Sequence, residues 1–561
     1  MDHPSRRLAE RLEQRLGDPN DERRPFSLAA ALRLDASDEF PAAPCRELDA
    51  VGLSDYYVPA RHGGRLRSFE ELMTTLRVAA RRDLTTALVH HATFLGAAPV
   101  WIGGAPETAA RLAGRVRDGD VVAFAVTEAD HGSDLLAGTT CATATAGGYR
   151  LDGEKWLINN ATRSRLVCVL ARTDPAGGAR GFSLFLVDKQ ELADGEYACL
   201  PAVRTVGVRG ADISGIRFTG AEVPRAALIG DLGAGLEITL KSFQLTRTLC
   251  AGFTLGAADR GLRLAMARAE RLGQTGQPDV RRVLAEAYAD LLTAETVGLL
   301  AVRSAHTLPD ELSVTAAVTK HLVPMLGDGL LGALGRLGGG WVDGPDQDVF
   351  EKVERDHRII GIFDGSSAVN LASLVNQFGF LSRAYRRGVA GGVAGGVLAG
   401  AELSTPVPDF EPDRLELVSR NGSSVLNHLP AALDRLTRRA GPGSELSRRA
   451  AQLRSAVDEV HDAMGAHRPT PRDVPATAFA LAERYALCFA AAACVQVWLA
   501  NPAAADGWLE GVLGRLVQRL GAPSQDDPGS AVDRLFPLLE RQYREHLLFS
   551  PFPARLAEGS A

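Results

Sequence analysis

The sequence predicts an α+β fold that is mostly helical, because the spacing of its apolar residues changes twice along the chain. Apolar residues recur every three or four positions through residues 1 to about 120, for example from Leu84 to Leu95, which predicts helices. From Val121 to about Leu228 the period is two, which predicts strands. Helical spacing then resumes. At 561 residues the chain is too long for one ordinary domain.

These changes divide the chain into five segments. We expect a helical domain over residues 1–120, a β-barrel or β-sandwich over 121–228 and a helical domain over 229–383. Residues 384–402 are rich in glycine, and each glycine inside a helix costs about 1 kcal/mol relative to alanine. We therefore expect a flexible linker there. Residues 403–561 are expected to form an additional helical domain.

Composition excludes several classes of protein. The net charge of −6 and the pI near 6.1 give no basic field that would attract nucleic acid. The seven cysteines are widely spaced without a C-x-x-C pair, which indicates reduced thiols in the cytoplasm and no zinc site. The first residues lack an apolar run and carry acids among their bases, so we expect neither a secretory signal nor a transit peptide. The apolar run from Tyr485 to Ala500 is shorter than the roughly 20 residues of a membrane span, so we expect a buried helix and no transmembrane segment.

One stretch combines features of a cofactor site. Phe124 to Asp134 is predicted to be a strand that breaks at its glycine, leaving backbone N–H groups and the hydroxyls of Thr127 and Ser133 at the strand end. Such an end can hold a flat cofactor that carries phosphate groups. Gly153 to Asn160 is predicted to be the turn and return strand of a hairpin.

Together these two stretches resemble the β-domain signature of the acyl-CoA dehydrogenase family, in which the segment wraps the isoalloxazine ring of FAD. The resemblance implies that family's fold, with a helical domain, a β-domain and a four-helix bundle that is complete by about residue 383. The remaining residues resemble the helical tail of the very-long-chain enzymes. The implied activity is FAD-dependent dehydrogenation of an acyl thioester, by removal of an α-proton and transfer of a β-hydride to the flavin.

The stretch Arg355 to Ser367 resembles the part of the family that holds the catalytic base. The resemblance assigns the base to Asp364, where most members have glutamate. A carboxylate in a dry pocket has a raised pKa, which suits removal of an α-proton beside a thioester. Some members place the base at the position of Thr246, which has no carboxylate. Arg247 matches an arginine that adjoins the catalytic acid.

The resemblance also implies two sets of binding residues. The residues for FAD are Phe124, Val126, Thr127, Gly132, Ser133, Leu157, Ile158, Asn159, Gly338, Gly339 and Ser366. The residues for the substrate are Ser133, Phe243, Gln244, Arg247 and Gly365. The histidines show no spacing typical of metal ligands.

Further positions depart from the family, among them Ala211 and Ile213, where hydroxyl residues are usual, and Gln244, where many members have aspartate. A tryptophan that covers the flavin falls at Leu157, a hydroxyl residue that bonds the flavin N5 falls at Asn159, and an arginine that reaches the FAD pyrophosphate of a neighbouring subunit falls at Ala269. The Asn159 amide can still donate to N5.

These departures leave two alternatives open. One is a flavin-dependent monooxygenase or oxidase on the same fold, and the other is a flavin-bound partner subunit without catalysis. The acyl carrier can be CoA or an acyl-carrier protein, and the electron acceptor can be an electron-transfer flavoprotein or oxygen. We expect a homodimer, because the added helical domain would cover the face through which smaller members form tetramers.

Overall fold

The computed structural model describes residues 3–337, 345–388, 394–469, 474–504, 507–521 and 529–558. The chain divides into two compact units. The first, here called the helical unit, contains Met1–Asp21, Ser68–Arg82 and Arg247–Ala561. The second, here called the sheet unit, contains Glu22–Arg67 and Asp83–Thr246. Each unit combines pieces of several predicted segments, so the division of the chain into five domains stays a prediction.

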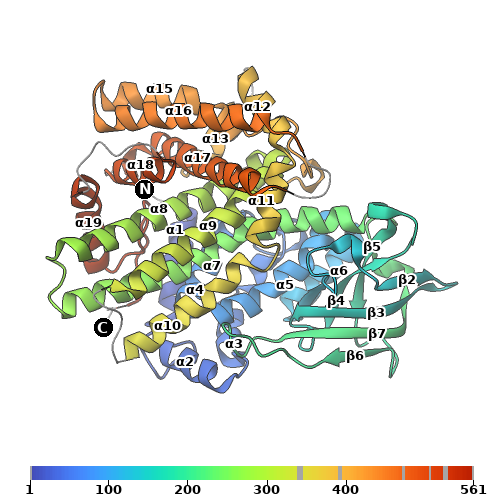
Figure 1. Cartoon of the computed structure of the whole chain (residues 1–561). Helices are drawn as coiled ribbons and strands as arrows, with labels where there is room; N and C mark the ends of the chain where they lie inside the picture. Colours follow the sequence, from blue (N-terminus) through green and yellow to red (C-terminus); the bar gives the residue numbers. More distant parts are fainter. Residues whose placement is uncertain are drawn as a thin grey trace. The chain divides into compact units, whose positions relative to one another are not determined.

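The sheet unit contains one eight-stranded sheet (Figure 1). The strands run in the order β6-β7-β3-β2-β4-β5-β8, and β1 pairs with β4 in parallel. The strand bounds are β1 Val122–Ala125, β2 Cys141–Ala144, β3 Gly148–Asn159, β4 Leu166–Arg172, β5 Phe182–Asp188, β6 Tyr197–Leu200, β7 Ile213–Pro224 and β8 Leu228–Ile229. The long antiparallel pair of β3 and β7 is interrupted by two register shifts, after Leu151 and after Trp156. The second shift lies within a predicted cofactor stretch.

The same unit contains several α-helices. They are α2 Leu28–Ser37, α3 Ala42–Ala50, α5 Leu84–Gly103 and α6 Pro106–Arg117. Of these, α5 packs against the sheet at β1, β4 and β8. Helix α5 begins where the Asp83 carboxylate accepts a hydrogen bond from the Thr86 amide at 2.8 Å, which is a typical N-cap. It packs against β1 so closely that a Cβ on Gly96 would lie 2.6 Å from the Val122 carbonyl oxygen. Only glycine permits that approach of helix and strand.

The helical unit is built around α8 Pro278–Thr307, which is buried along most of its length. Its neighbours include α9, α17 and α19 (Figure 1). The other helices of this unit are α1 Pro4–Leu16, α4 Phe69–Arg82, α9 Leu312–Gly335, α10 Pro345–His357, α11 Ser367–Val375, α12 Phe378–Arg387, α13 Ala394–Ala401, α14 Ser424–Asn427, α15 Leu429–Ala440, α16 Glu445–Ala466, α17 Ala476–Ala500, α18 Trp508–Arg519 and α19 Gly529–Arg544. Helix α7, Gly235–Arg271, begins in the sheet unit and continues in the helical unit.

The glycine-rich stretch is helical where the structure describes it, so the prediction of a linker without a helix is wrong for residues 394–401. Helix α13 forms there because its glycines allow close packing against α8. A Cβ on Gly396 would lie 2.7 Å from Leu308 Cδ2, and Val397 and Ala401 are buried. Burial of this helix offsets the intrinsic cost of its glycines. Residues 389–393 of the predicted linker lie outside the described part of the chain.

The apolar run that ends at Ala500 belongs to a 25-residue helix, α17. The helix is longer than the apolar run itself and is, among the described residues, the one helix long and apolar enough to cross a membrane. However, 67% of its most apolar window is buried inside the protein, and it packs against α8, α15, α16 and α18. The contacts are those of a core helix. The length of α17 therefore does not exclude a membrane span, whereas its burial supports the expected buried helix.

Buried ion pairs between side chains connect the N-terminal and C-terminal segments of the chain within the helical unit. Arg81 on α4 is fully buried and donates to Glu13 at 2.8 Å and to Glu558 at 2.6 Å. Glu558 also bonds Arg260 and lies 3.5 Å from the Nε of Arg263. Burial alone would raise the pKa of the Glu558 carboxyl, but the three guanidinium groups hold it well below its usual range. These buried ion pairs thus fix the C-terminal segment.

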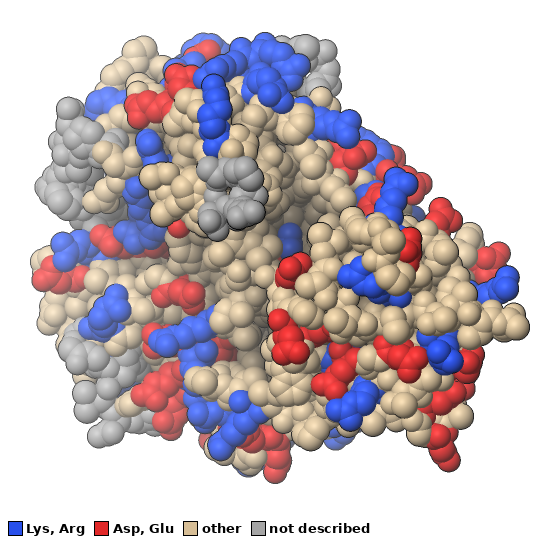
Figure 2. All heavy atoms as spheres, turned by 45° about the vertical axis from the view of Figure 1, so that its right-hand side comes forward, with Lys and Arg blue, Asp and Glu red and all other residues tan. Residues whose placement is uncertain are grey.

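Figure 2 shows one face of the surface, where basic and acidic side chains are interspersed over most of the area.

Candidate active site

The end of β1 is fastened to β3 in the sheet unit. The hydroxyl of Thr127 donates to the carbonyl oxygen of Trp156 at 2.7 Å, and the amide of Trp156 donates to the carbonyl oxygen of Thr127 at 3.0 Å. The ring of Phe124 lies 5.7 Å from that of Phe243 at the start of α7. We call residues 126–133 together with residues 156–160 the β1–β3 edge. It contains most of the predicted FAD residues.

Leu157 sits on the β-bulge between Trp156 and Ile158. Its φ of +57° is unusual for a residue other than glycine, and 52% of the side chain is exposed. Ile158 and Val126, in contrast, are buried. A bulge re-aims a side chain. Here it turns one apolar side chain of the edge toward the outside of the sheet unit.

Asn159 carries an incompletely bonded amide. Its nitrogen lies 3.4 Å from the carbonyl oxygen of Leu88 on α5. Its Oδ1 atom is buried and has no hydrogen-bond partner among the described residues. Buried polar atoms are normally paired, so this oxygen is a position where a bound group would supply the partner. The second amide hydrogen remains for donation to the same group.

Glu128 of the β1–β3 edge and the neighbouring Lys155 form a buried ion pair that was not predicted from the sequence. The Lys155 ammonium donates to Glu128 at 2.9 Å and to the Val126 carbonyl at 3.0 Å. Glu128 also accepts the amides of Thr139 at 2.7 Å and Thr140 at 3.0 Å. The pair therefore closes the loop that presents the predicted residues Gly132 and Ser133, which are exposed. Glu128 and Lys155 lie within the two stretches that predict the cofactor site, but a single sequence does not identify them as partners.

Neutralising Glu128 is expected to destabilise the protein by about 3–5 kcal/mol, because Lys155 would stay buried without its counter-charge. Burial would raise the pKa of Glu128, but Lys155 and the two amides outweigh it and lower the pKa to about 2. Since the folded pKa lies below the unfolded one, the stabilisation is complete above about pH 5 and disappears as the pH falls toward 2. Urea unfolding of wild type and Glu128→Gln as a function of pH measures this.

The matched control is Glu154→Gln on the same strand. Glu154 pairs with Arg217 at 2.7 Å, but both side chains are well exposed, so the expected cost is below about 1 kcal/mol. Equal effects of the two substitutions, or a Glu128→Gln effect that does not change below pH 5, would contradict the role given to the buried pair.

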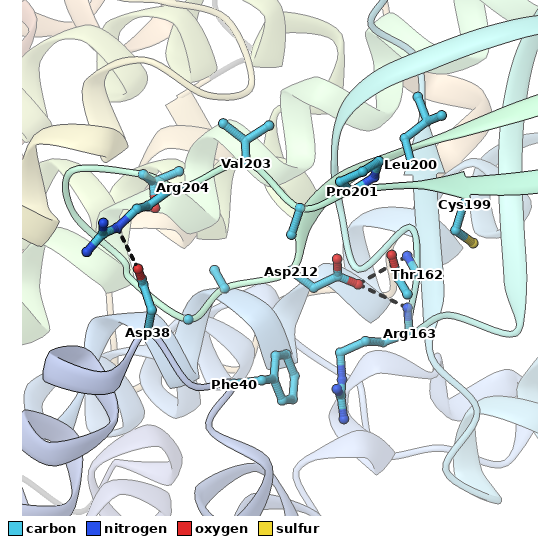
Figure 3. A pocket seen from close by; sticks show the side chains of 14 residues that line it. Asp38, Phe40, Thr162, Arg163, Cys199, Leu200, Pro201, Val203, Arg204 and Asp212 are labelled. Carbon is cyan, nitrogen blue, oxygen red and sulfur yellow. Dashed lines mark hydrogen bonds and ion pairs between the residues drawn. The ribbon is translucent and has the colours of Figure 1, made fainter.

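Asp212 anchors the turn that follows β3. Its carboxylate accepts the amides of Thr162 at 3.1 Å and Arg163 at 3.0 Å, as Figure 3 shows. Its main-chain oxygen accepts the amide of Asn160 at 2.7 Å. Asp212 thereby fixes the chain directly after Asn159. Asp212, Thr162 and Arg163 line a pocket of about 600 Å³ in the sheet unit, where the Arg163 guanidinium lies 3.7 Å from the centre of the Phe40 ring. None of the predicted site residues lines this pocket.

In the helical unit, Arg247 holds the loop of Asp364. The Nε atom of Arg247 donates to the Asp364 main-chain oxygen at 2.7 Å. Burial lowers the pKa of the guanidinium, and the charge of Asp364 opposes that shift. Asp364 has a φ of +54° and Gly365 a φ of +93°. A Cβ on Gly365 would lie 2.7 Å from Arg247 Nη2, so this position requires glycine. The structure thus brings together three of the predicted residues.

The other predicted residues have varied surroundings. Ser366 caps α11 by accepting the Val369 amide at 3.5 Å. Gln244 is buried on α7, in the part that belongs to the sheet unit. Gly338 and Gly339 lie outside the described residues.

Comparison with known proteins decides the family. The profile for the acyl-CoA dehydrogenase middle domain matches residues 123–221, and the profile for the C-terminal domain matches residues 233–378. Cyclohex-1-ene-1-carbonyl-CoA dehydrogenase of Geobacter metallireducens is 32% identical over 287 residues, which cover 50% of this chain and 74% of the relative. The chain belongs to the acyl-CoA dehydrogenase family. The resemblance noted in the sequence is thereby confirmed.

Further relatives agree. The human mitochondrial short-chain specific acyl-CoA dehydrogenase is 27% identical over 379 residues, covering 65% of this chain and 88% of the relative. An acyl-CoA dehydrogenase from Bacillus anthracis, solved with FAD, is similar in fold with a TM-score of 0.71 and 16% identity, covering 97% of this chain and 96% of that one. The butyryl-CoA dehydrogenase of Megasphaera elsdenii covers 66% of this chain and 95% of its own, with 20% identity and a TM-score of 0.59. The predicted fold class, including the additional C-terminal helices, is confirmed.

Acyl-CoA dehydrogenases are FAD-dependent oxidoreductases that act on CH–CH bonds, and this chain is one of them. The β1–β3 edge fits a flavin in three respects. Leu157 offers an exposed apolar side chain, Asn159 offers a buried oxygen without a partner, and Ser133 offers an exposed hydroxyl. Beside Ser133, no described atom lies within 4 Å of a Cβ placed on Gly132, so the backbone is open to a ligand.

Proposed function

We propose that this acyl-CoA dehydrogenase introduces an α,β double bond into an acyl thioester. The observation that carries the proposal is the Asp364 loop, in which a carboxyl-bearing residue is held by the main-chain bond from Arg247. Asp364 removes the α-proton of the thioester, and Arg247 fixes the residue and favours its ionised form. When bound, FAD accepts the β-hydride. Thr127, Leu157 and Asn159 hold the flavin, and Phe243 and Gln244 contact the substrate.

The left-handed backbone at Asp364 gives a physical reason for aspartate in place of glutamate. Aspartate and asparagine adopt this conformation more readily than other residues that have a Cβ. The shorter side chain reaches less far, so the backbone must present it close to the thioester. Side chains that donate hydrogen bonds to the loop hold the backbone of Asp364 in this strained conformation. Strained backbone at functional sites usually persists because the surrounding structure holds it in this way.

We infer that the acyl carrier is CoA, because the relatives in Geobacter metallireducens and human mitochondria are CoA-ester dehydrogenases by name. We further infer that the electron acceptor is an electron-transfer flavoprotein and that the protein is a homodimer. Sedimentation analysis tests the homodimer.

The substrate is identified by incubating the purified holoprotein with saturated acyl-CoAs of graded length and branching and analysing the products by mass spectrometry. The expected product is lighter by two hydrogen atoms. Unchanged masses for every acyl-CoA, together with conversion of an acyl-carrier-protein thioester, would overturn the choice of carrier.

An oxidase is the second candidate, and Leu157 favours it. A half-exposed leucine covers less of a ring than tryptophan does, which would leave oxygen a path to the reduced flavin. Rapid reoxidation of the reduced, ligand-bound protein by air would support the oxidase. Persistence of the reduced flavin under air would exclude it and leave the dehydrogenase.

A further inference from the structure

Lys320 is a fully buried lysine in the middle of α9. A buried ammonium group is costly unless polar groups bond it. Its Nζ atom donates to the main-chain oxygen of Ile360 and lies 5.0 Å from the centre of the Phe363 ring. Both partners belong to the stretch that leads directly into Asp364. The contacts of this buried ammonium group are therefore with the loop that carries the proposed base.

Side-chain donors bond four main-chain oxygens of this loop. Lys320 bonds Ile360, and Arg247 bonds Asp364. Asn370 Nδ2 donates to the oxygens of Gly365 and Ser366, each at 2.9 Å. Because residues 364 and 365 are both left-handed, an unbonded loop would relax away from this shape. Lys320 holds the entry to the strained part, whereas Arg247 and Asn370 hold the strained part itself.

The charges nearby also favour an ionised Asp364. The groups that interact electrostatically with Lys320 are Cys250, Asp364 and Arg247. Burial raises the pKa of the Cys250 thiol to about 12, so this thiol is neutral at physiological pH. Burial lowers the pKa of Lys320 while Asp364 opposes that shift. Among these four groups, Lys320 and Arg247 are the two cations, and each interacts electrostatically with Asp364.

We propose that Lys320 is a positioning residue for the Asp364 loop and that it favours the ionised carboxylate of Asp364. This inference rests on the proposed role of Asp364 as the base. Lys320 does not touch the reacting atoms. It acts through the Ile360 oxygen, the Phe363 ring and its charge.

The test compares Lys320→Met with wild type. Methionine keeps most of the buried volume but removes the donor and the charge. Lys352→Met is the matched control, because Lys352 is also a buried lysine of the helical unit, but it pairs with Asp356 on α10. Lys320→Gln is made as well, so that one variant is available if the other fails to fold.

Two measurements are made on each folded variant. The first is the rate of flavin reduction by the preferred acyl-CoA as a function of pH. Loss of the cation is expected to move the acidic limb of this profile to higher pH by about one unit. At a given pH on that limb, the rate would then be about tenfold lower. The second is amide hydrogen exchange, which is expected to become faster at residues 360–366. Lys352→Met removes the lysine partner of the buried Asp356, so it controls for the loss of a buried lysine alone, and the acidic limb of its profile is expected to stay at the wild-type pH.

A pH profile at Lys320→Met equal to that of wild type, with unchanged exchange at 360–366, would overturn the inference. A rate that falls equally at every pH, with no shift of the profile and no faster exchange of the loop, would also overturn the inference. Such a result would indicate a structural role alone. Failure of the proposed function is recognised separately, because the wild-type flavin would then resist every acyl thioester. In that event the exchange at residues 360–366 still decides whether Lys320 holds the loop.

Discussion

Replacing Asp364 with asparagine is expected to lower the rate of flavin reduction by an acyl-CoA about 10²- to 10⁴-fold, the range by which general bases accelerate proton transfer. Asparagine also tolerates the left-handed backbone, and the bond from Arg247 goes to the main-chain oxygen, so the fold and the FAD content should not change. Anaerobic stopped-flow absorbance measures the rate. Solvent deuterium exchange at the substrate α-carbon should fall in parallel.

Asp434→Asn is the control for this experiment. Asp434 is an exposed residue of α15 that pairs with Arg454, and its loss should leave flavin reduction unchanged. Reduction of the Asp364→Asn flavin at the wild-type rate would show that another group removes the proton, and the assignment of the base would be wrong.

The variant Glu558→Gln is expected to lose about 3–5 kcal/mol of unfolding free energy. The substitution leaves the buried guanidinium group of Arg260 without its carboxylate, while Arg81 keeps Glu13 and Arg263 keeps Asp259. The measurement is urea or thermal unfolding near neutral pH.

Glu540→Gln serves as its comparison, since Glu540 pairs with Arg544 at 2.8 Å on the exposed side of α19. That exposed pair is worth less than about 1 kcal/mol. If Glu558→Gln unfolded at the same denaturant concentration as wild type, the C-terminal segment would not be fixed by charge in the way the structure indicates.

Local periodicity predicted the change from helices to strands and back to helices. The run of period two ends close to the last strand, Leu228–Ile229, and the long helical pattern after it is α7. Periodicity could not show that α4 joins the C-terminal helices, because the contact of Arg81 with Glu558 spans 477 positions. It also failed at α13, where a glycine penalty is outweighed by packing against α8 that only the folded chain reveals.

Motif resemblance supplied candidate residues for the site but not the residues that support them. Arg247, Asp364 and Gly365 are in contact, as a shared role requires. The buried lysines Lys155 and Lys320 were missed, because a lysine in a sequence usually indicates an exposed position. Both lysines donate to main-chain oxygens, which no side-chain pattern identifies.

The most direct test of the central claim is the visible spectrum of the purified holoprotein, recorded without oxygen while acyl-CoAs are added in turn. If the protein is an α,β-dehydrogenase of acyl thioesters, one class of saturated acyl-CoA will bleach the oxidised flavin band in proportion to the amount added. A flavin band that no acyl-CoA and no carrier-protein thioester bleaches would contradict the account.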